Sequence, residues 1–343
     1  MNKPVITVLL TTYRRPDLLK LAIKSVLRQK HIELELIVID DHSKDSTQST
    51  VKSFVDSRIR YIENKKNFGF PGVFKKGVEL SRGEYIFLLS DDDLIVRDDT
   101  LNYVYRMMKR KKALYGQTGL MFYDTDPRAP YRWATPHILK TVYFPPSKSL
   151  LFNTRRWHFG FASGNIYKTD IVNKQDIIDD IWFSHVKPIY RALARGSALY
   201  FGDYFILGRI SKTGNVSYLN ISVNKEFHME KMFSLYREFD GSSTHLKAFK
   251  KMHLEEGGIN NFVGIKFYTS NKNVLEIARA ILRIDPIYTY YLFFWINLFA
   301  ALIIPKSVIS YLRDQRIRDD QKKLTMLLKK IKFWKYLRGT IHT

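Results

Sequence analysis

Short apolar runs alternate with amphipathic stretches through the first hundred residues of the chain. Residues 5–10 and 34–39 are almost continuously apolar, which is typical of strands buried on both faces of a sheet. Further strands are predicted at 59–62 and 85–89, and Pro16 opens a stretch whose apolar residues recur at helical spacing. Strands that alternate with helices at this spacing form parallel βαβ units. The pattern therefore predicts an α/β fold with a Rossmann-like mixed, mostly parallel sheet flanked by helices.

A second pattern, near the C-terminus, is an apolar run without any charge over residues 287–304. Asp285 and Pro286 precede it as a helix cap and a first-turn proline, and Pro305 ends it. As a helix the run would measure about 27 Å, slightly less than the hydrocarbon core of a bilayer at about 30 Å. Its tyrosines and Trp295 suit a membrane interface better than the bilayer centre.

The stretch that follows, residues 321–338, is basic and amphipathic. Its apolar residues recur at helical spacing, with the lysines mostly elsewhere; they are Leu324, Leu327, Leu328, Ile331 and Trp334. This pattern is typical of a helix that lies on an anionic bilayer. Three interpretations remain open: a membrane-surface or half-inserted anchor, which we favour, a spanning helix over 287–304, and a core helix followed by a solvated surface helix.

Charge and composition narrow the class of protein. The 343 residues include 56 Lys and Arg against 33 Asp and Glu, a net charge of +23 that predicts a polyanionic neighbour, either nucleic acid or an anionic membrane surface. The chain has no cysteine, which excludes disulfides, thiolate nucleophiles and zinc ribbons. The first apolar run is too short for a secretory signal, so we expect a cytoplasmic start.

Polar residues gather where three predicted strands end. Residues 11–13, 40–41 and 91–93 all fall at carboxyl ends of strands, the edge at which parallel sheets bind ligands. Neither a dinucleotide fingerprint nor a P-loop is present. Adjacent carboxylates at Asp91, Asp92 and Asp93 predict a site for Mg²⁺ or Mn²⁺ that also binds substrate phosphates. The alternative for Asp93 is a cap of the next helix.

Two further residues at this edge have both a binding and a structural interpretation. Tyr13 could stack on a nucleotide base or simply pack against its neighbours. Asp40 could accept a hydrogen bond from a base or ribose, or it could close an Asx turn, which Asp41 and Ser43 could also satisfy.

The chain resembles the inverting nucleotide-sugar glycosyltransferases of family two, which have the A-type glycosyltransferase fold. The resemblance is carried by four strings in the family's order: VITVLLTTYRRPDLLKLAIKSVL, LIVIDDHSKDST, NFGFPG and GEYIFLLSDDDLI. It covers residues 4–110 well and continues faintly to about 220. The chain departs from the family at Ser90, where Asp is frequent, and at residues 73–75, where Ala-Arg-Asn is common.

The resemblance implies a role for each matching position. Thr11 and Tyr13 would flank the base, with Tyr13 stacked on it, and Asp40 would read the base edge. Asp91 and Asp92 would hold the donor diphosphate through Mn²⁺ or Mg²⁺. The donor would be a nucleotide-diphosphate-sugar, with UDP-sugars the first expectation.

The catalytic base is implied less directly. Many relatives place an acidic pair twelve and eleven residues before a glycine that ends an arginine-containing helix. The string at 191–196, RALARG, resembles that helix end and puts Ser184 and His185 at those positions. The resemblance therefore implies His185 as the base, with Asp180 as the second candidate. The alternative is that His185 is only a polar helix residue with Asp180 as its cap.

These observations predict a glycosyltransferase, of the hexosyl or deoxyhexosyl class, that acts on a lipid-linked or surface-polysaccharide acceptor. We expect a catalytic domain at 1–225, divided into a nucleotide-sugar half (1–110) and an acceptor half (111–225), a helical link at 226–284 and a membrane-associating extension at 285–343. The expected location is the cytoplasmic face of the cell membrane. The C-terminal helices could also pair two copies of the chain. One alternative is a basic nucleic-acid-binding protein, although the sequence contains no known nucleic-acid recognition module. The other is an inactive transferase fold that serves as a membrane scaffold.

Overall fold

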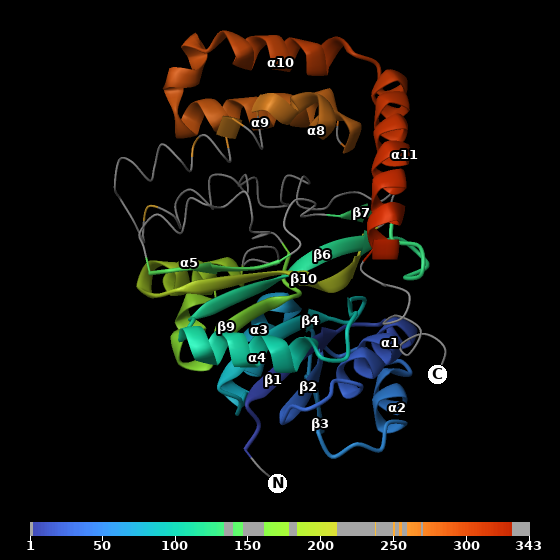
Figure 1. Ribbon diagram of the computed structural model, residues 1–343. Helices are drawn as coiled ribbons and strands as arrows, with labels where there is room; N and C mark the ends of the chain where they lie inside the picture. The colour runs from blue at the N-terminus through green and yellow to red at the C-terminus, as the bar shows by residue number, and fades with distance from the viewer. Residues whose placement is uncertain are drawn as a thin grey trace. The chain divides into compact units, whose positions relative to one another are not determined.

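The computed structural model describes residues 3–133, 140–146, 161–177, 184–210, 237, 250, 254–255, 259–268 and 270–330 (Figure 1). The chain divides into two compact units, which are described separately below. The first, here called the sheet unit, comprises residues 1–150, 156–210 and 323–343; the second, the helical unit, comprises 151–155 and 211–322. The three-part division of the chain expected from the sequence stays a prediction.

One mixed sheet forms the sheet unit, with the strand order β3-β2-β1-β4-β9-β6-β10-β5. β1, β2, β3 and β4 pair in parallel, as do β6 and β10, whereas β9 lies antiparallel between β4 and β6. The short β7 pairs with β6, and β8 with β10. The strands are β1 (Ile6–Thr12), β2 (Leu34–Asp40), β3 (Ile59–Glu63), β4 (Tyr85–Ser90), β5 (Leu94–Ile95), β6 (Tyr115–Tyr123), β7 (Arg132–Trp133), β8 (Thr141–Phe144), β9 (Asn165–Lys168) and β10 (Ala198–Arg209). The predicted fold class is confirmed.

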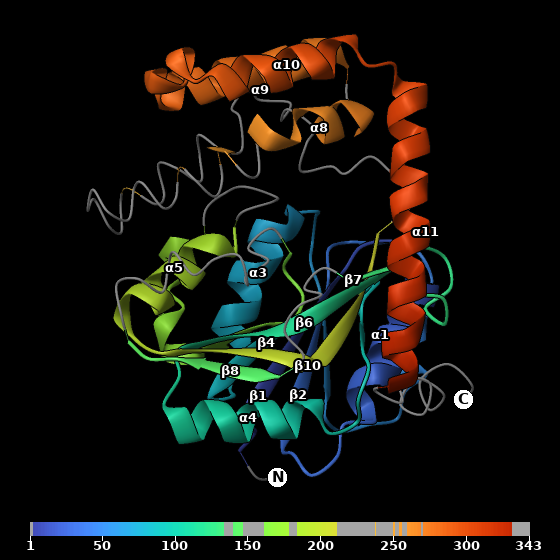
Figure 2. The same ribbon diagram turned by 45° about the horizontal axis from the view of Figure 1, so that its top comes forward.

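Helices cover both faces of this sheet. They are α1 (Pro16–Leu27), α2 (Thr47–Lys52), α3 (Gly69–Leu80), α4 (Thr100–Lys111) and α5 (Val186–Arg195). Figure 2 shows α4 below β8 and β10 and α5 above them. α1 begins at Pro16 as predicted and buries Leu19, Ile23 and Val26 against the sheet. Because β1 and β2 are covered on both faces, their apolar runs contain almost no exposed position.

Two glycines allow close approach of α3 and of the turn before β4 to β1. A Cβ on Gly77 would lie 2.3 Å from Leu9 Cδ2, and one on Gly83 would lie 2.4 Å from the backbone nitrogen of Thr7. Both contacts are far below van der Waals distance, so these positions fix how closely the first βαβ units pack.

The helical unit contains short helices around its own apolar core. It includes η7 (Ile259–Asn261), α8 (Phe262–Tyr268), α9 (Asn271–Ile284), η8 (Pro286–Tyr290), α10 (Leu292–Ile303) and the first part of α11 (Lys306–Lys330). Phe262, Ile277 and Phe294 lie in its core. Asp285 caps η8 by accepting a hydrogen bond from the backbone nitrogen of Ile287, as predicted.

The uncharged run at 287–304 does not form one helix. η8 ends at Tyr290 and α10 begins at Leu292. Among the described residues, no single helix has the length and apolar composition to cross a membrane. α10 and residues 306–315 reach that composition only as a pair bent by 104°.

The apolar stripe predicted on 321–338 has a different partner from the expected bilayer. Leu324 and Leu328 are buried within the sheet unit, in a cluster with Leu94, Tyr123 and Leu207. Protein side chains therefore cover these two leucines, and the expectation that they face lipid is corrected. Residues 331–343, with the predicted Ile331 and Trp334, lie outside the described part of the chain.

Candidate active site

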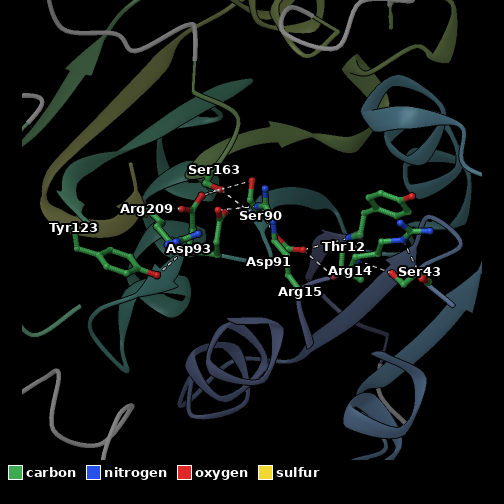
Figure 3. A network of polar contacts seen from close by, with 12 residues as sticks. Thr12, Arg14, Arg15, Ser43, Ser90, Asp91, Asp93, Tyr123, Ser163 and Arg209 are labelled. Atoms are coloured by element: carbon green, nitrogen blue, oxygen red, sulfur yellow. Dashed lines mark hydrogen bonds and ion pairs between the residues drawn. The ribbon is translucent and has the colours of Figure 1, made fainter. Parts of the chain in front are cut away.

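The acidic turn after β4 forms the centre of the site. The backbone nitrogen of Asp93 donates to the carbonyl of Ser90 at 3.2 Å, which closes a tight turn around Asp91 and Asp92. Asp91 lies against the end of β1, where its Oδ2 accepts from Thr12 Oγ1 at 2.8 Å and from the backbone nitrogen of Tyr13 at 3.3 Å (Figure 3). The parallel pairing of β1 and β4 brings these residues together, as the sequence predicted.

Two of the carboxylates converge on one cation. Arg15 Nη1 lies 3.2 Å from Asp91 Oδ1 and 2.8 Å from Asp92 Oδ2. The Arg15 side chain is half exposed at 49%, whereas that of Asp91 is buried. A single positive group therefore bridges Asp91 and Asp92 at the surface of the site.

Asp91 and Asp92 fit the demands of a divalent cation. Mg²⁺ sites in phosphate-binding proteins use one or two carboxylates and complete the shell with substrate phosphates and water. The two oxygens that converge on Arg15 supply such a pair. Within the described residues no group of three or more His, Cys, Asp or Glu side chains is arranged to hold a metal ion, so further ligands would have to come from substrate and solvent.

Asp93 points away from this pair into the protein. It is 1% exposed, accepts a hydrogen bond from Ser163 Oγ, and accepts another from the backbone nitrogen of Arg209 at 2.9 Å (Figure 3). These contacts join the acidic turn to the segment before β9 and to the end of β10, which is a structural role. The helix-cap alternative is wrong, because β5 follows Asp93 and Asp99 precedes α4.

Burial dominates the electrostatics of the turn. It raises the pKa of Asp91 to about 6, with the charge of Asp92 adding to the effect and Arg15 and Thr12 opposing it. Burial also raises the pKa of Asp92, against the charges of Arg15 and Arg209, and raises that of Asp93 well above its ordinary value. Holding three carboxylates here costs folding free energy, which is typical of functional sites.

The predicted nucleotide-binding residues lie along the same edge. Thr11 is half-buried at the end of β1. Tyr13 is 39% exposed, with the Arg14 guanidinium 5.0 Å from its ring centre. The backbone nitrogen of Arg14 donates to Ser43 Oγ at 2.8 Å, which joins the ends of β1 and β2. The residue whose backbone contacts Asp91 therefore has an exposed aromatic ring, and its stacking on a base stays a prediction.

Asp40 is engaged on both oxygens within the protein. Oδ1 accepts from the backbone nitrogen of Ser43 at 3.0 Å and from its hydroxyl at 2.5 Å, and Oδ2 accepts from Tyr61 Oη at 2.7 Å. Asp40 is 2% exposed, and its contacts close the turn that follows β2 onto Ser43, three residues on. Its predicted reading of a base edge stays a prediction.

Asp41 has a structural role that the sequence did not reveal. Its carboxylate accepts from the backbone nitrogens of Phe68 and Gly69 at 2.9 and 2.8 Å and from Asn64 Nδ2 at 2.9 Å. It therefore fixes the loop that leads into α3, at the point where Gly69 has a positive φ of 66°.

His185, the predicted base, lies at the start of α5 and is 1% exposed. Its ring meets Phe70 edge-on at 6.1 Å, and its carbonyl accepts from Tyr167 Oη at 3.1 Å. An acceptor hydroxyl could reach this ring only after the surrounding side chains move. The helix end predicted at Gly196 is confirmed. Asp180 lies outside the described residues.

The sequence missed residues that the fold brings to the acidic turn from other parts of the chain. Thr12 and Arg15 contact Asp91, Ser163 and Arg209 hold Asp93, and Tyr123 Oη donates to the carbonyl of Asp92 at 2.6 Å. Arg15 carried the clearest signal, since it lies two residues beyond Tyr13 on the predicted binding edge.

Residues 7–172 match the model of the family described as glycosyl transferase family 2. WcaA of Escherichia coli K12, named as a putative colanic acid biosynthesis glycosyl transferase, is 40% identical over 94 residues, or 27% of this chain and 34% of WcaA. TuaG of Bacillus subtilis, a putative teichuronic acid biosynthesis glycosyltransferase, is 26% identical over 69% of this chain and 89% of its own. WfgD of Escherichia coli, a UDP-Glc:α-D-GlcNAc-diphosphoundecaprenol β-1,3-glucosyltransferase, is 28% identical over 34% of this chain and 46% of its own. The matches to WcaA and WfgD therefore span less than half of those proteins.

Two solved structures share the fold. TarS from S. aureus in complex with UDP-GlcNAc has a TM-score of 0.59 at 15% identity, covering 90% of this chain and 92% of that one. The mannosyltransferase PcManGT from Pyrobaculum calidifontis, in complex with GDP-Man and Mn²⁺, has a TM-score of 0.53 at 17% identity, covering 88% and 87%. At these identities the likeness concerns the arrangement of helices and strands.

Proposed function

This chain is a glycosyltransferase of family 2 with the A-type glycosyltransferase fold, and we propose that it transfers a hexosyl or deoxyhexosyl group with inversion. The donor is a nucleotide-diphosphate-sugar, and the acceptor is lipid-linked or a surface polysaccharide at the cytoplasmic face of the membrane. The convergence of Asp91 and Asp92 on one cation carries this proposal, and Tyr13 supports it, because its backbone nitrogen contacts Asp91 while its ring is exposed.

The donor is bound along the edge formed by β1, β2 and β4. Tyr13 stacks on the base and Thr11 flanks it, while Asp40 contributes through the turn that it holds with Ser43. Asp91 and Asp92 hold Mn²⁺ or Mg²⁺, which supplies positive charge to the leaving diphosphate when bound. Asp93 keeps the turn in place from inside the protein.

Transfer with inversion needs one base. The acceptor oxygen attacks the anomeric carbon of the donor as the base takes its proton, and the bond from that carbon to the diphosphate breaks. His185 is our first candidate for the base and Asp180 the second. For His185 the role requires that the contact with Phe70 opens when the acceptor binds.

The names of the relatives support the choice of acceptor. WcaA and TuaG are named as putative glycosyltransferases of colanic acid and teichuronic acid biosynthesis, and WfgD is named for transfer onto α-D-GlcNAc-diphosphoundecaprenol. Uridine donors are favoured because TarS holds UDP-GlcNAc and WfgD is named for UDP-Glc, although PcManGT holds GDP-Man.

A thermal-shift panel of nucleoside diphosphates, with and without Mn²⁺, tests the proposal. A ligand at a hundred times its Kd adds about 2.7 kcal/mol to the free energy of unfolding. We expect one diphosphate, UDP first, to raise Tm only when the metal is present. Asp92→Asn should abolish the shift, and Asp99→Asn, on an exposed carboxylate outside the site, should keep it. No shift with any nucleotide would remove the basis of the proposal.

A further inference from the structure

α10 presents a fully apolar face to the solvent. All of its exposed positions carry large apolar residues, which are Leu292, Phe293, Ile296, Phe299 and Ile303, with exposed fractions from 50% to 74%. The opposite side of the same helix, at Phe294, Leu298 and Ala301, is buried in the core of the helical unit. A helix that is apolar on both sides but buried on only one exposes an apolar surface to water, which is typical of a site that binds a partner or a membrane.

The neighbouring elements extend this surface with residues of an interfacial type. Tyr290 of η8 is 91% exposed and Tyr311 of α11 is 62% exposed. Trp295 donates its indole N–H to the carbonyl of Thr289 at 2.8 Å, so its polar atom is satisfied within the protein. Tyrosine and tryptophan at the border of an apolar surface are typical of the headgroup region of a bilayer.

The fold keeps α10 from continuing into α11 as a straight helix. Lys266 is buried in α8, and its Nζ donates to the carbonyls of Leu302 and Ile304, both at 2.9 Å. These carbonyls belong to the last turn of α10, where a positive charge also interacts favourably with the helix dipole. Pro305 follows, and the axis turns by 104°.

The length of α10 excludes a span by this helix alone. Its 12 residues measure about 18 Å, whereas the hydrocarbon core of a bilayer is about 30 Å thick. Its inner face packs against α8 and α9, which lie below it in Figure 1. Only the outer face is free to enter lipid.

We propose that the outer face of α10 inserts into one leaflet of an anionic bilayer and anchors the enzyme there as a monotopic protein. The charge of the chain selects anionic lipid, because the net charge is +23. This role of α10 rests on the proposed function: the surface would hold the enzyme beside a lipid-linked acceptor.

Vesicle co-sedimentation tests the surface directly. The full chain is incubated with large unilamellar vesicles of phosphatidylglycerol and phosphatidylcholine, and the bound fraction is measured for the wild type, for Ile296→Asp/Phe299→Asp and for Val55→Asp. Val55 is a fully exposed apolar residue of the sheet unit and serves as the matched control. We expect the double variant to bind at least tenfold more weakly and Val55→Asp to bind like the wild type.

Single-cysteine probes add a second readout without background, because the chain contains no cysteine. An environment-sensitive fluorophore on Ile296→Cys should shift its emission to the blue when vesicles are added, and the same fluorophore on Val55→Cys should not. An unchanged emission at position 296, or unchanged sedimentation of the double aspartate variant, would overturn the proposal. So would a dimer, seen by sedimentation velocity, that these substitutions dissociate while vesicle binding persists.

The same variants separate this inference from the proposed chemistry. Ile296→Asp/Phe299→Asp should retain the metal-dependent Tm shift with nucleoside diphosphate. If the wild type shows no nucleotide shift but binds vesicles through α10, the transferase proposal fails and the membrane surface stands.

Discussion

Asp91→Asn should make the free protein more stable at neutral pH while it abolishes metal-dependent donor binding. Asp91 is buried, and its pKa is raised from 3.8 to about 6 mainly by burial. The folded chain therefore holds the Asp91 proton more tightly than the unfolded chain does. Keeping this carboxyl ionised in the folded protein costs stability, which a neutral asparagine does not.

The magnitude follows from the difference between the two pKa values. A pKa that rises from 3.8 to about 6 corresponds to about 3 kcal/mol of folding free energy at a pH above both values. Asparagine can turn its oxygen toward Thr12 and the backbone nitrogen of Tyr13, but its amide group then faces Arg15. Since Arg15 is half exposed, it can move into water, and we expect a net gain of about 1–3 kcal/mol.

The pH dependence gives the sign of the effect. The wild type loses the contribution of Asp91 to stability as the pH rises from about 4 to about 6, and the loss is complete above that range. The asparagine variant does not titrate, so its advantage should grow over the same interval and then remain constant. For a domain of this size each kcal/mol changes Tm by about 2–4 °C, which differential scanning fluorimetry at pH 4, 5, 6 and 8 resolves.

An opposite control is available at Asp98, whose pKa is lowered by its hydrogen bond to Lys30. Asp98→Asn should lower stability slightly at neutral pH, and the difference should vanish as the pH falls below about 4. If Asp91→Asn lowers Tm at pH 8, or if its effect on Tm is the same at every pH, the reasoning about a buried, destabilising carboxylate is refuted.

Three further substitutions test other parts of the structure. Gly83→Ala should destabilise the protein by about 3 kcal/mol in urea titrations, because its Cβ would lie 2.4 Å from the Thr7 backbone nitrogen. Gly69→Ala is strained only by its positive φ, since its Cβ would lie 3.6 Å from Pro71 Cδ, and a cost of Gly83→Ala below that of Gly69→Ala would contradict the packing. Arg15→Gln should raise the affinity of the free enzyme for Mn²⁺ about fivefold by calorimetry, because it removes a cation whose exposed ion pairs contribute about 1 kcal/mol; unchanged affinity would show that Arg15 does not compete with the metal. Leu328→Asp should lower the unfolding free energy by about 3 kcal/mol, because Leu328 lies in a buried cluster. A variant of unchanged stability with weakened vesicle binding would show instead that Leu328 contacts lipid.

The sheet of the first hundred residues was predictable because its strands are buried on both faces. The strand predicted at 34–39 is observed at Leu34–Asp40, and that predicted at 85–89 is observed at Tyr85–Ser90. Such runs leave little choice of register or face, so the ends of the strands, and the polar residues that follow them, could be located from the sequence. The meeting of Asp91 with the end of β1 follows from parallel pairing alone.

The direction of each side chain was not predictable in the same way. Asp93 is adjacent to the two carboxylates that contact Arg15, yet it turns to Ser163 and to the backbone of Arg209, which lie 70 and 116 residues further along the chain. The 104° turn after α10 also involves a tertiary contact, since nothing in an uncharged run indicates that Lys266 will bind the last carbonyls of the helix. Helical periodicity showed that Leu324 and Leu328 need an apolar partner but could not choose between lipid and protein.

The three consecutive carboxylates differ most in what neutralises them. Asp93 is held by a hydroxyl and a backbone N–H, donors that belong to the fold and cannot leave without opening it. Asp91 also accepts from a hydroxyl and a backbone N–H through its Oδ2, but its Oδ1 shares the guanidinium of Arg15 with Asp92. Arg15 is half exposed and can move into solvent when another cation arrives. A divalent ion can thus take the place of Arg15 and cannot take the place of Ser163. Burial makes ionisation of all three carboxylates unfavourable. A bound cation can offset this free-energy cost only at Asp91 and Asp92, because only their positive partner can be exchanged. This difference is the physical reason for assigning the cation site to Asp91 and Asp92 and the support of the turn to Asp93.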